Sequence, residues 1–166
     1  MCYRSNSRDV MIRNAKKDDI KAICFLSNEV NAEHSEAMPD TFAKIALLDR
    51  DADYWLAYLA RDDAHILLIE FEGSIKGMAA VSIPTGLKPS FLVDKRVCNL
   101  STIVVARSAR RQGLGKQLIL AVERYAHEND ASEVLLEVMQ FNQPAIAFYR
   151  SVGYDDFSTK LAKSLN

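Results

Sequence analysis

The stretch from Val97 to Met139 constrains the fold more than any other part of the chain, because its pattern predicts a strand, a helix and a second strand in succession. Residues 97–106 (VCNLSTIVVA) and 132–139 (SEVLLEVM) are both apolar and strand-like. Between them, apolar side chains recur at helical spacing along one stripe: Leu114, Leu118, Ala121, Val122 and Tyr125. Two strands joined through a helix pair in parallel, by a right-handed crossover. We therefore expect a parallel strand pair here.

A hairpin is predicted immediately upstream, over residues 65–83 (HILLIEFEGSIKGMAAVSI). Gly73 and Ser74 lie between two apolar runs, and alternate residues of the second run share one face. Because a hairpin is antiparallel, we expect a mixed sheet with helices on its faces. Residues 10–15 predict a first strand, and residues 154–165 are predicted to finish the sheet with a short hairpin or an edge pair.

Three further helices are predicted around these strands. The first begins with Asp18 as its N-cap, and the second lies within residues 51–60. The third has Pro144 in its first turn and Gly153 as its stop. Residues 84–94 are predicted to form a loop.

The composition is that of an ordinary globular protein, with 166 residues of which 49% are apolar and 26% charged. This length predicts a single domain over residues 1–166. A formal net charge of −1 argues against nucleic-acid binding by the whole molecule. The sequence holds no apolar run near the roughly 20 residues that a membrane span requires, so no membrane association is expected.

Cysteine and histidine usage predicts a reduced, cytoplasmic setting without a metal. The three cysteines lie far apart with no C-x-x-C pair, and the three histidines are scattered. The first ten residues lack the apolar core of a signal peptide. We therefore expect neither a disulfide framework nor a metal site.

Residues 110–118 (RRQGLGKQL) place glycines and positive charge where the central helix begins. A Walker A loop requires glycine where Arg110 stands and serine or threonine where Gln117 stands, and a dinucleotide fingerprint requires glycine or alanine where Leu118 stands. Neither motif is present. The open amides and the dipole of a helix start still suit an anion. The sequence thus predicts a phosphate site, with a merely basic helix start as the alternative.

Charge is distributed unevenly along the chain. Residues 29–72 hold eleven acidic and three basic side chains, whereas residues 95–122 hold six basic side chains and no acidic one. Solvated surfaces often carry such runs of charge, so the simplest interpretation of the acidic stretch is a solvated surface without a binding role.

Two segments, Leu100–Leu118 and Glu137–Tyr154, together resemble the linked motifs of the GNAT acetyltransferase superfamily. RRQGLG is similar to that family's Q/R-x-x-G-x-G/A motif, and EVMQFNQPAIAFYRSVGY is similar to its closing pattern. IRNAKKDDI and HSEAMPDTF are similar to further segments found in the superfamily. The resemblance therefore covers nearly the whole chain, in the expected order.

The resemblance implies an α/β (α+β) fold with a GNAT-like mixed, mostly antiparallel central sheet, a splayed parallel pair and helices on both faces. It implies acetyl-CoA as the cofactor, with its pyrophosphate on the amides that open the central helix and its pantetheine arm along the preceding strand. The implied cofactor-binding residues are Ile103, Val104, Val105, Arg110, Arg111, Gln112, Gly113, Leu114, Gly115, Lys116 and Asn142. For Asn142, capping of the following helix is the alternative.

The implied chemistry is direct transfer of the acetyl group to a primary amine in a ternary complex. A backbone N–H of the strand holds the oxyanion, and Tyr149 is the implied general acid that protonates the departing sulfur. The alternative for Tyr149 is simple packing of its helix. The acceptor is expected to be a small cationic molecule or a peptide or protein amine, and a homodimer is a further expectation. The resemblance also implies that the acidic stretch, residues 29–72, forms much of the acceptor wall, where its charge would favour a cationic amine.

The sequence departs from the family pattern at two places. Arg111 stands where the family frequently has glycine, a mild departure because arginine still presents its backbone amide. Many relatives carry an acidic residue where Ser101 and Thr102 stand here, and a hydroxyl is no base near neutral pH. The proton of the acceptor must then leave by water or by another group, for which Glu33, His34 and Glu36 are the candidates. The loss of this acid keeps an alternative function open, namely a GNAT-like module that binds CoA without catalysis.

Overall fold

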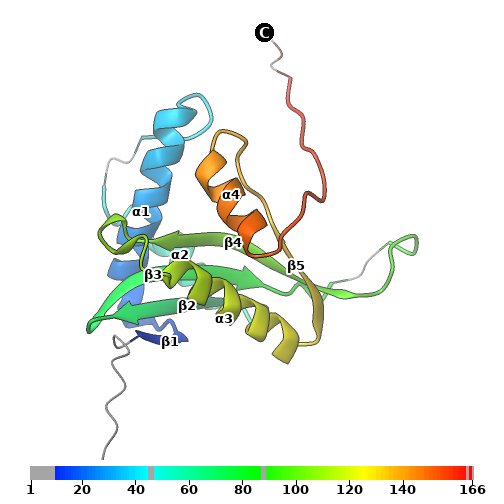
Figure 1. Ribbon diagram of the computed structural model, residues 1–166, viewed down its shortest axis with the longest axis horizontal. Helices are drawn as coiled ribbons and strands as arrows, with labels where there is room; N and C mark the ends of the chain where they lie inside the picture. Colours follow the sequence, from blue (N-terminus) through cyan, green and yellow to red (C-terminus); the bar gives the residue numbers. More distant parts are fainter. Residues whose placement is uncertain (1–9, 45–46, 87–88, 164, 166) are drawn as a thin grey trace, which may run out of the picture.

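The computed structural model describes residues 10–44, 47–86, 89–163 and 165. Within them a five-stranded sheet has the order β1-β2-β3-β4-β5 (Figure 1). The strands are β1 (Val10–Asn14), β2 (Ala64–Phe71), β3 (Ser74–Ser82), β4 (Arg96–Val105) and β5 (Ala131–Leu136). The helices are α1 (Ile20–Ala37), α2 (Ala52–Leu59), α3 (Leu114–Glu128) and α4 (Gln143–Ser151), with short 3-10 turns at Lys17–Asp19 and Arg107–Ala109.

Strand pairing confirms the mixed sheet. Strands β1 to β4 pair antiparallel in succession, and β4 pairs parallel to β5 across the α3 crossover. The predicted hairpin between β2 and β3 turns at Glu72 and Gly73, whose φ angles are 52° and 74°. Two successive left-handed residues match the right-handed twist of the strands that they join, and glycine adopts this conformation without strain.

Both faces of the sheet are covered, as predicted. On one face Ile66, Leu68 and Met78 pack with buried side chains of α1 and α2. On the other face Ile69 and Val81 pack with the apolar stripe of α3 and with partly buried side chains of α4. Because both faces are covered, β3 is buried at every position from Gly77 to Ser82 rather than at alternate ones.

The parallel pair is splayed. Pairing between β4 and β5 ends at Leu100 and Leu136, yet β4 continues to Val105. A register shift in the β3–β4 ladder places Ser101 as the extra residue at this point. Residues 102–105 of β4 therefore pair with β3 alone and offer their other edge to the space beside β5.

The hairpin or edge pair predicted at the end of the chain is wrong for residues 154–163, which form no strand. The apolar side chains that would anchor such strands do not pack, since Phe157 is 73% exposed and Leu161 is 89% exposed. Asp156 instead forms an ion pair with Arg150 of α4, 2.8 Å between Nη2 and Oδ2, and the chain then runs away from the sheet (Figure 1).

The predicted N-cap of the first helix is wrong by one residue. A 3-10 turn precedes α1, and Asp19 rather than Asp18 occupies the N-cap position. The Asp19 carboxylate accepts hydrogen bonds from the Lys16 amide at 2.7 Å and the Arg13 guanidinium at 2.8 Å. These bonds hold the short turn, which spacing of apolar residues alone does not reveal.

Candidate active site

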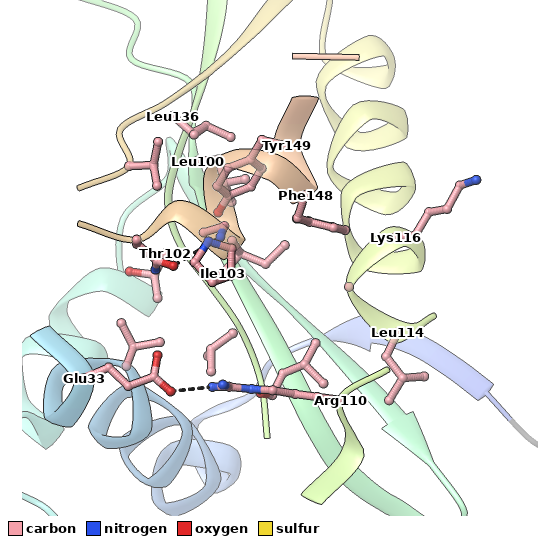
Figure 2. A pocket seen from close by; sticks show the side chains of 18 of the residues that line it. Glu33, Leu100, Thr102, Ile103, Arg110, Leu114, Lys116, Leu136, Phe148 and Tyr149 are labelled. Carbon is pink, nitrogen blue, oxygen red and sulfur yellow. Dashed lines mark hydrogen bonds and ion pairs between the residues drawn. The ribbon is translucent and has the colours of Figure 1, made fainter. Parts of the chain in front are cut away.

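A cleft of about 650 Å³ opens where β4 and β5 separate, between α1, α4 and the start of α3. Eleven of the twelve residues predicted for the site line it, and Gln112 does not. The eleven are Ile103, Val104, Val105, Arg110, Arg111, Gly113, Leu114, Gly115, Lys116, Asn142 and Tyr149. Figure 2 shows Glu33 and Arg110 facing each other at one end of the cleft, with Tyr149 and Leu136 at the other.

The floor of the cleft is the end of β4 that β5 leaves unpaired. Ile103 and Val105 are half-buried there, and their backbone is held on the other side by β3. The Ser101 hydroxyl donates to the Ala80 carbonyl at 3.1 Å and lies 3.3 Å from the Tyr58 hydroxyl. A serine hydroxyl is not a base near neutral pH, so Ser101 does not replace the missing acid.

The start of α3 forms the anion-binding end of the cleft. Its N-cap, Gly113, has φ 79° and no side chain to cap the first amides. Arg111 also has a positive φ, 61°, in a conformation that a non-glycine residue adopts at a cost of about 1 kcal/mol. A positive φ favours glycine, which is consistent with the expectation that Arg111 stands in place of a glycine. The open amides and the helix dipole together suit a phosphate group.

Arg110 holds the start of α3 to α1. Its guanidinium donates to Glu33 at 3.0 Å and to the Val105 carbonyl at 3.1 Å. Arg107 donates from its side chain to the same Glu33 oxygen at 3.3 Å. Lys116, although it lines the cleft, extends away from Ile103 and Tyr149 (Figure 2). Arg110 was expected to face the phosphate groups. In the structure it is instead paired with Glu33.

The start of α4 forms another wall of the cleft. The side-chain oxygen of Asn142 accepts from the Ala145 amide at 3.1 Å, so Asn142 caps the helix as the alternative interpretation predicted. Tyr149 projects from α4 into the cleft, and its ring packs against Phe148 and Tyr154 with centroids 5.5 and 6.0 Å apart. Burial raises the pKa of Tyr149 to about 12, which keeps the phenol protonated at neutral pH.

We expect the protein to lose stability as the pH rises above about 9, where thiols and phenols begin to ionise in an unfolded chain. Burial raises the pKa of Tyr149 and Tyr154 to about 12 and that of Cys98 to about 11. The unfolded chain releases these protons first. The stability is therefore intact below the ordinary pKa values and falls as the pH approaches the folded ones. Urea unfolding at several pH values, followed by Trp55 fluorescence, measures the effect.

The variant Tyr154→Phe is the control for this prediction. The Tyr154 hydroxyl is buried, and none of the described residues is hydrogen-bonded to it. Its removal should not lower the free energy of unfolding near pH 8, since no bond is lost. The fall at alkaline pH should become shallower in the variant. A fall as steep as that of the unmodified protein would show that Tyr154 is not among the groups responsible.

The acidic stretch does not form a wall of the cleft. Of its eleven acidic side chains only Glu33 lines the cleft, and two arginines already engage it. Most of the run lies in and around α2 and the β2–β3 hairpin, which cover other surfaces. The second acidic lining residue is Glu137, which follows β5. A preference for cationic ligands therefore depends on Glu33 and Glu137 rather than on the whole stretch.

Several lining residues are absent from the predicted set of cofactor-binding residues and Tyr149. These are Val30, His34, Leu100, Ser101, Thr102, Ala109, Leu136, Glu137, Val138, Met139, Pro144, Ala145 and Phe148, together with Glu33. Glu33 and His34 were candidate bases, whereas Glu36, the third candidate, is not in the lining. The carboxyl ends of parallel strands meet at one edge of a sheet, so residues 137–139 follow from the predicted β4–β5 pair. The position of α1 across the cleft does not follow from the predicted strand pair.

None of the helices in the described part of the chain is both long enough and apolar enough to traverse a lipid bilayer.

Residues 27–154 match the family described as "Acetyltransferase (GNAT) family". Among curated proteins, the "Uncharacterized N-acetyltransferase YhfO" of Bacillus subtilis (strain 168) is 29% identical over 147 residues, which cover 87% of this chain and 89% of that relative.

Solved structures share the fold. A tetramutant of the BH1408 protein from Bacillus halodurans aligns with a TM-score of 0.87 at 18% identity, over 93% of this chain and 99% of that one. The aminoglycoside N-acetyltransferase AAC(6')-Iy, solved in complex with CoA, aligns with a TM-score of 0.73 at 19% identity, over 99% of both chains. At these identities the likeness concerns the arrangement of helices and strands.

Proposed function

Because this chain belongs to the acetyltransferase (GNAT) family, we propose that it transfers the acetyl group of acetyl-CoA directly to a primary amine in a ternary complex. The observation that carries the proposal is the unpaired end of β4 beside the open start of α3, within one cleft. An extended chain with amide groups fits the free edge of a strand, and a pyrophosphate fits the amides of a helix start.

The residues present fit acetyl-CoA. The free edge of Ile103–Val105 would hold the pantetheine arm, and the amides from Gly113 to Lys116 would hold the pyrophosphate. A Cβ at Gly113 would meet no atom within 4 Å, so the space before these amides is open. When bound, acetyl-CoA supplies an activated thioester.

Two groups of the chain then act on the reacting atoms. A backbone N–H on the free edge of β4 stabilises the negative charge that develops on the thioester oxygen as the amine attacks. The carbon–nitrogen bond forms and the carbon–sulfur bond breaks, with the electron pair leaving on sulfur. Tyr149 gives its phenolic proton to that sulfur and regains one from the attacking nitrogen.

The acceptor is proposed to be a cationic amine, either a small molecule or a peptide or protein amine. Glu33 and Glu137 supply the acidic lining of the cleft, and AAC(6')-Iy is named for aminoglycoside acetylation. A panel of a polyamine, an aminoglycoside and a lysine peptide, assayed by thiol release, tests this class. Faster transfer to neutral or acidic amines would contradict it.

We expect acetyl-CoA to stabilise the folded protein. At about 100 times its Kd, a ligand adds about 2.7 kcal/mol to the free energy of unfolding. Thermal unfolding with acetyl-CoA, and with adenosine and ATP for comparison, measures the shift. Arg111→Ala should reduce it, because Arg111 lines the cleft. The matched control is Arg124→Ala, an exposed cation of α3 outside the cleft lining, which should leave the shift unchanged.

The two functions left open by the sequence separate in these assays. A specific shift with thiol release supports the transferase, and a specific shift without thiol release for any amine supports a CoA-binding module. No shift with millimolar acetyl-CoA would contradict both.

A further inference from the structure

We propose that His34 is the general base that takes the proton from the acceptor ammonium. The assignment rests on the acetyl transfer proposed above and supplies the step for which β4 carries no acid. His34 lies on α1, is half-buried, and lines the same cleft as Tyr149.

The tautomer of His34 is determined by its own helix. Its Nδ1 lies 2.8 Å from the Val30 carbonyl oxygen, one turn earlier. A carbonyl oxygen only accepts hydrogen bonds, so Nδ1 carries the hydrogen in this contact. In the neutral ring, Nε2 is then left with the lone pair. That is the form in which an imidazole accepts a proton.

Two aromatic rings, those of Phe42 and Phe141, pack against the His34 imidazole and hold its orientation. Phe42, which follows α1, lies 4.9 Å from it between centroids, with the planes tilted by 57°. Phe141, which precedes α4, lies 5.4 Å away in an edge-on arrangement. His34 therefore connects α1 with the segment that leads into α4. With Nδ1 turned to its own helix, Nε2 is the ring nitrogen left for a ligand in the cleft.

Competing bases are less suitable. The Glu33 oxygen Oε1 already accepts from Arg107 and Arg110. Glu137 is paired with Lys160, 3.6 Å between Nζ and Oε1, and its side chain is 60% exposed. A carboxylate is a much weaker base than an imidazole, and proton transfer from an ammonium is more favourable to the stronger base.

With His34 and Tyr149 in these roles, the protons of the reaction balance. The ammonium gives one proton to Nε2 of His34, which passes it to solvent. The neutral amine attacks, and its second proton reaches sulfur through Tyr149. The sum is the amide, the CoA thiol and one released proton. The charged or titratable side chains that line the same cleft as His34 are Glu33, Arg110, Arg111, Lys116, Glu137 and Tyr149.

The variant His34→Asn tests the base, because asparagine keeps an N–H for Val30 and lacks Nε2. At neutral pH, kcat/KM for the amine should fall by about 10- to 100-fold. Without a base, only the free amine reacts, so the variant's rate should keep rising with pH and approach the unmodified rate near the pKa of the acceptor. A merely structural role would give a constant ratio at all pH values, which would overturn the assignment.

Two controls and one independent readout complete the experiment. Glu36→Gln, an exposed acid of the same helix outside the cleft lining, should leave the rate and its pH profile unchanged. Glu137→Gln should lower the rate by a factor that does not depend on pH. Nitrogen-15 NMR of the ligand-free protein, with His34→Asn to identify the signal, should show hydrogen on Nδ1. Hydrogen on Nε2 would overturn the proposal.

Failure of the assignment and failure of the proposed function are distinguishable. If the unmodified protein releases no thiol with any amine, acetyl transfer itself is wrong and His34 has no such role. If the unmodified protein is active and His34→Asn matches it at neutral pH, only the assignment of the base is wrong.

Discussion

Replacing Tyr149 by phenylalanine is expected to lower kcat for acetyl transfer by about 100- to 1000-fold, while the Kd for acetyl-CoA changes by less than about threefold. The substitution removes only the hydroxyl. The ring retains its contacts with Phe148 and Tyr154, so α4 and the cleft stay in place. A group that donates its proton only as sulfur departs contributes to the transition state and not to binding.

Steady-state thiol release and a binding titration measure the two quantities separately. The matched control is Tyr154→Phe, which removes the hydroxyl of another half-buried tyrosine that does not line the cleft and should leave kcat unchanged. A Tyr149→Phe rate within about threefold of the unmodified protein would remove Tyr149 from the mechanism. A parallel loss of acetyl-CoA binding would instead assign it to the cofactor site.

Replacing Gly77 by valine is expected to lower the free energy of unfolding by about 3 kcal/mol, the largest stability effect that we predict. Gly77 lies on β3 opposite Val105, at the end of β4 that forms the cleft floor. A Cβ there would lie 2.7 Å from the Val104 carbonyl oxygen, 3.0 Å from Ile69 and 3.2 Å from Leu118. The nearest of these atoms is backbone within a ladder, which cannot rotate aside.

Urea unfolding followed by Trp55, the single tryptophan, measures this loss. The control is Gly86→Val, since a Cβ at Gly86 meets no atom within 4 Å and should change stability by less than about 0.5 kcal/mol. Because Gly77 sets the distance between β3 and β4, the valine variant should also weaken acetyl-CoA binding. Equal stability of the two variants would show that β4 moves to accommodate the side chain.

The order of helices and strands was predictable wherever local pattern and packing agree. The apolar stripe of α3 and the β-branched run of β4 each serve one structural purpose, so their period indicates their conformation. The end of the chain was not predictable in this way. Residues 154–163 alternate enough to suggest a strand, yet they pair with no strand of the described structure. A strand depends on a partner edge, which its own sequence does not contain.

The site was predictable where its residues are consecutive. The end of β4 and the start of α3 follow one another in the chain, so a motif shows both at once. The contact between Arg110 and Glu33 joins residues 77 positions apart and has no sequence signature. It also changes an interpretation, because a cation expected to face phosphate is paired with an acid of α1.

What the sequence determined by itself is therefore local: the strands, the helix starts, the glycines that leave amides open and the tyrosine of α4. What only the tertiary structure decided is where separate segments meet. The parallel register ends at Leu100 and opens the cleft, and the packing of α1 brings His34 between Phe42 and Phe141. The physical reason is that hydrogen bonding within an element depends on neighbours in the chain, whereas the contacts that assemble a site depend on how the whole core packs.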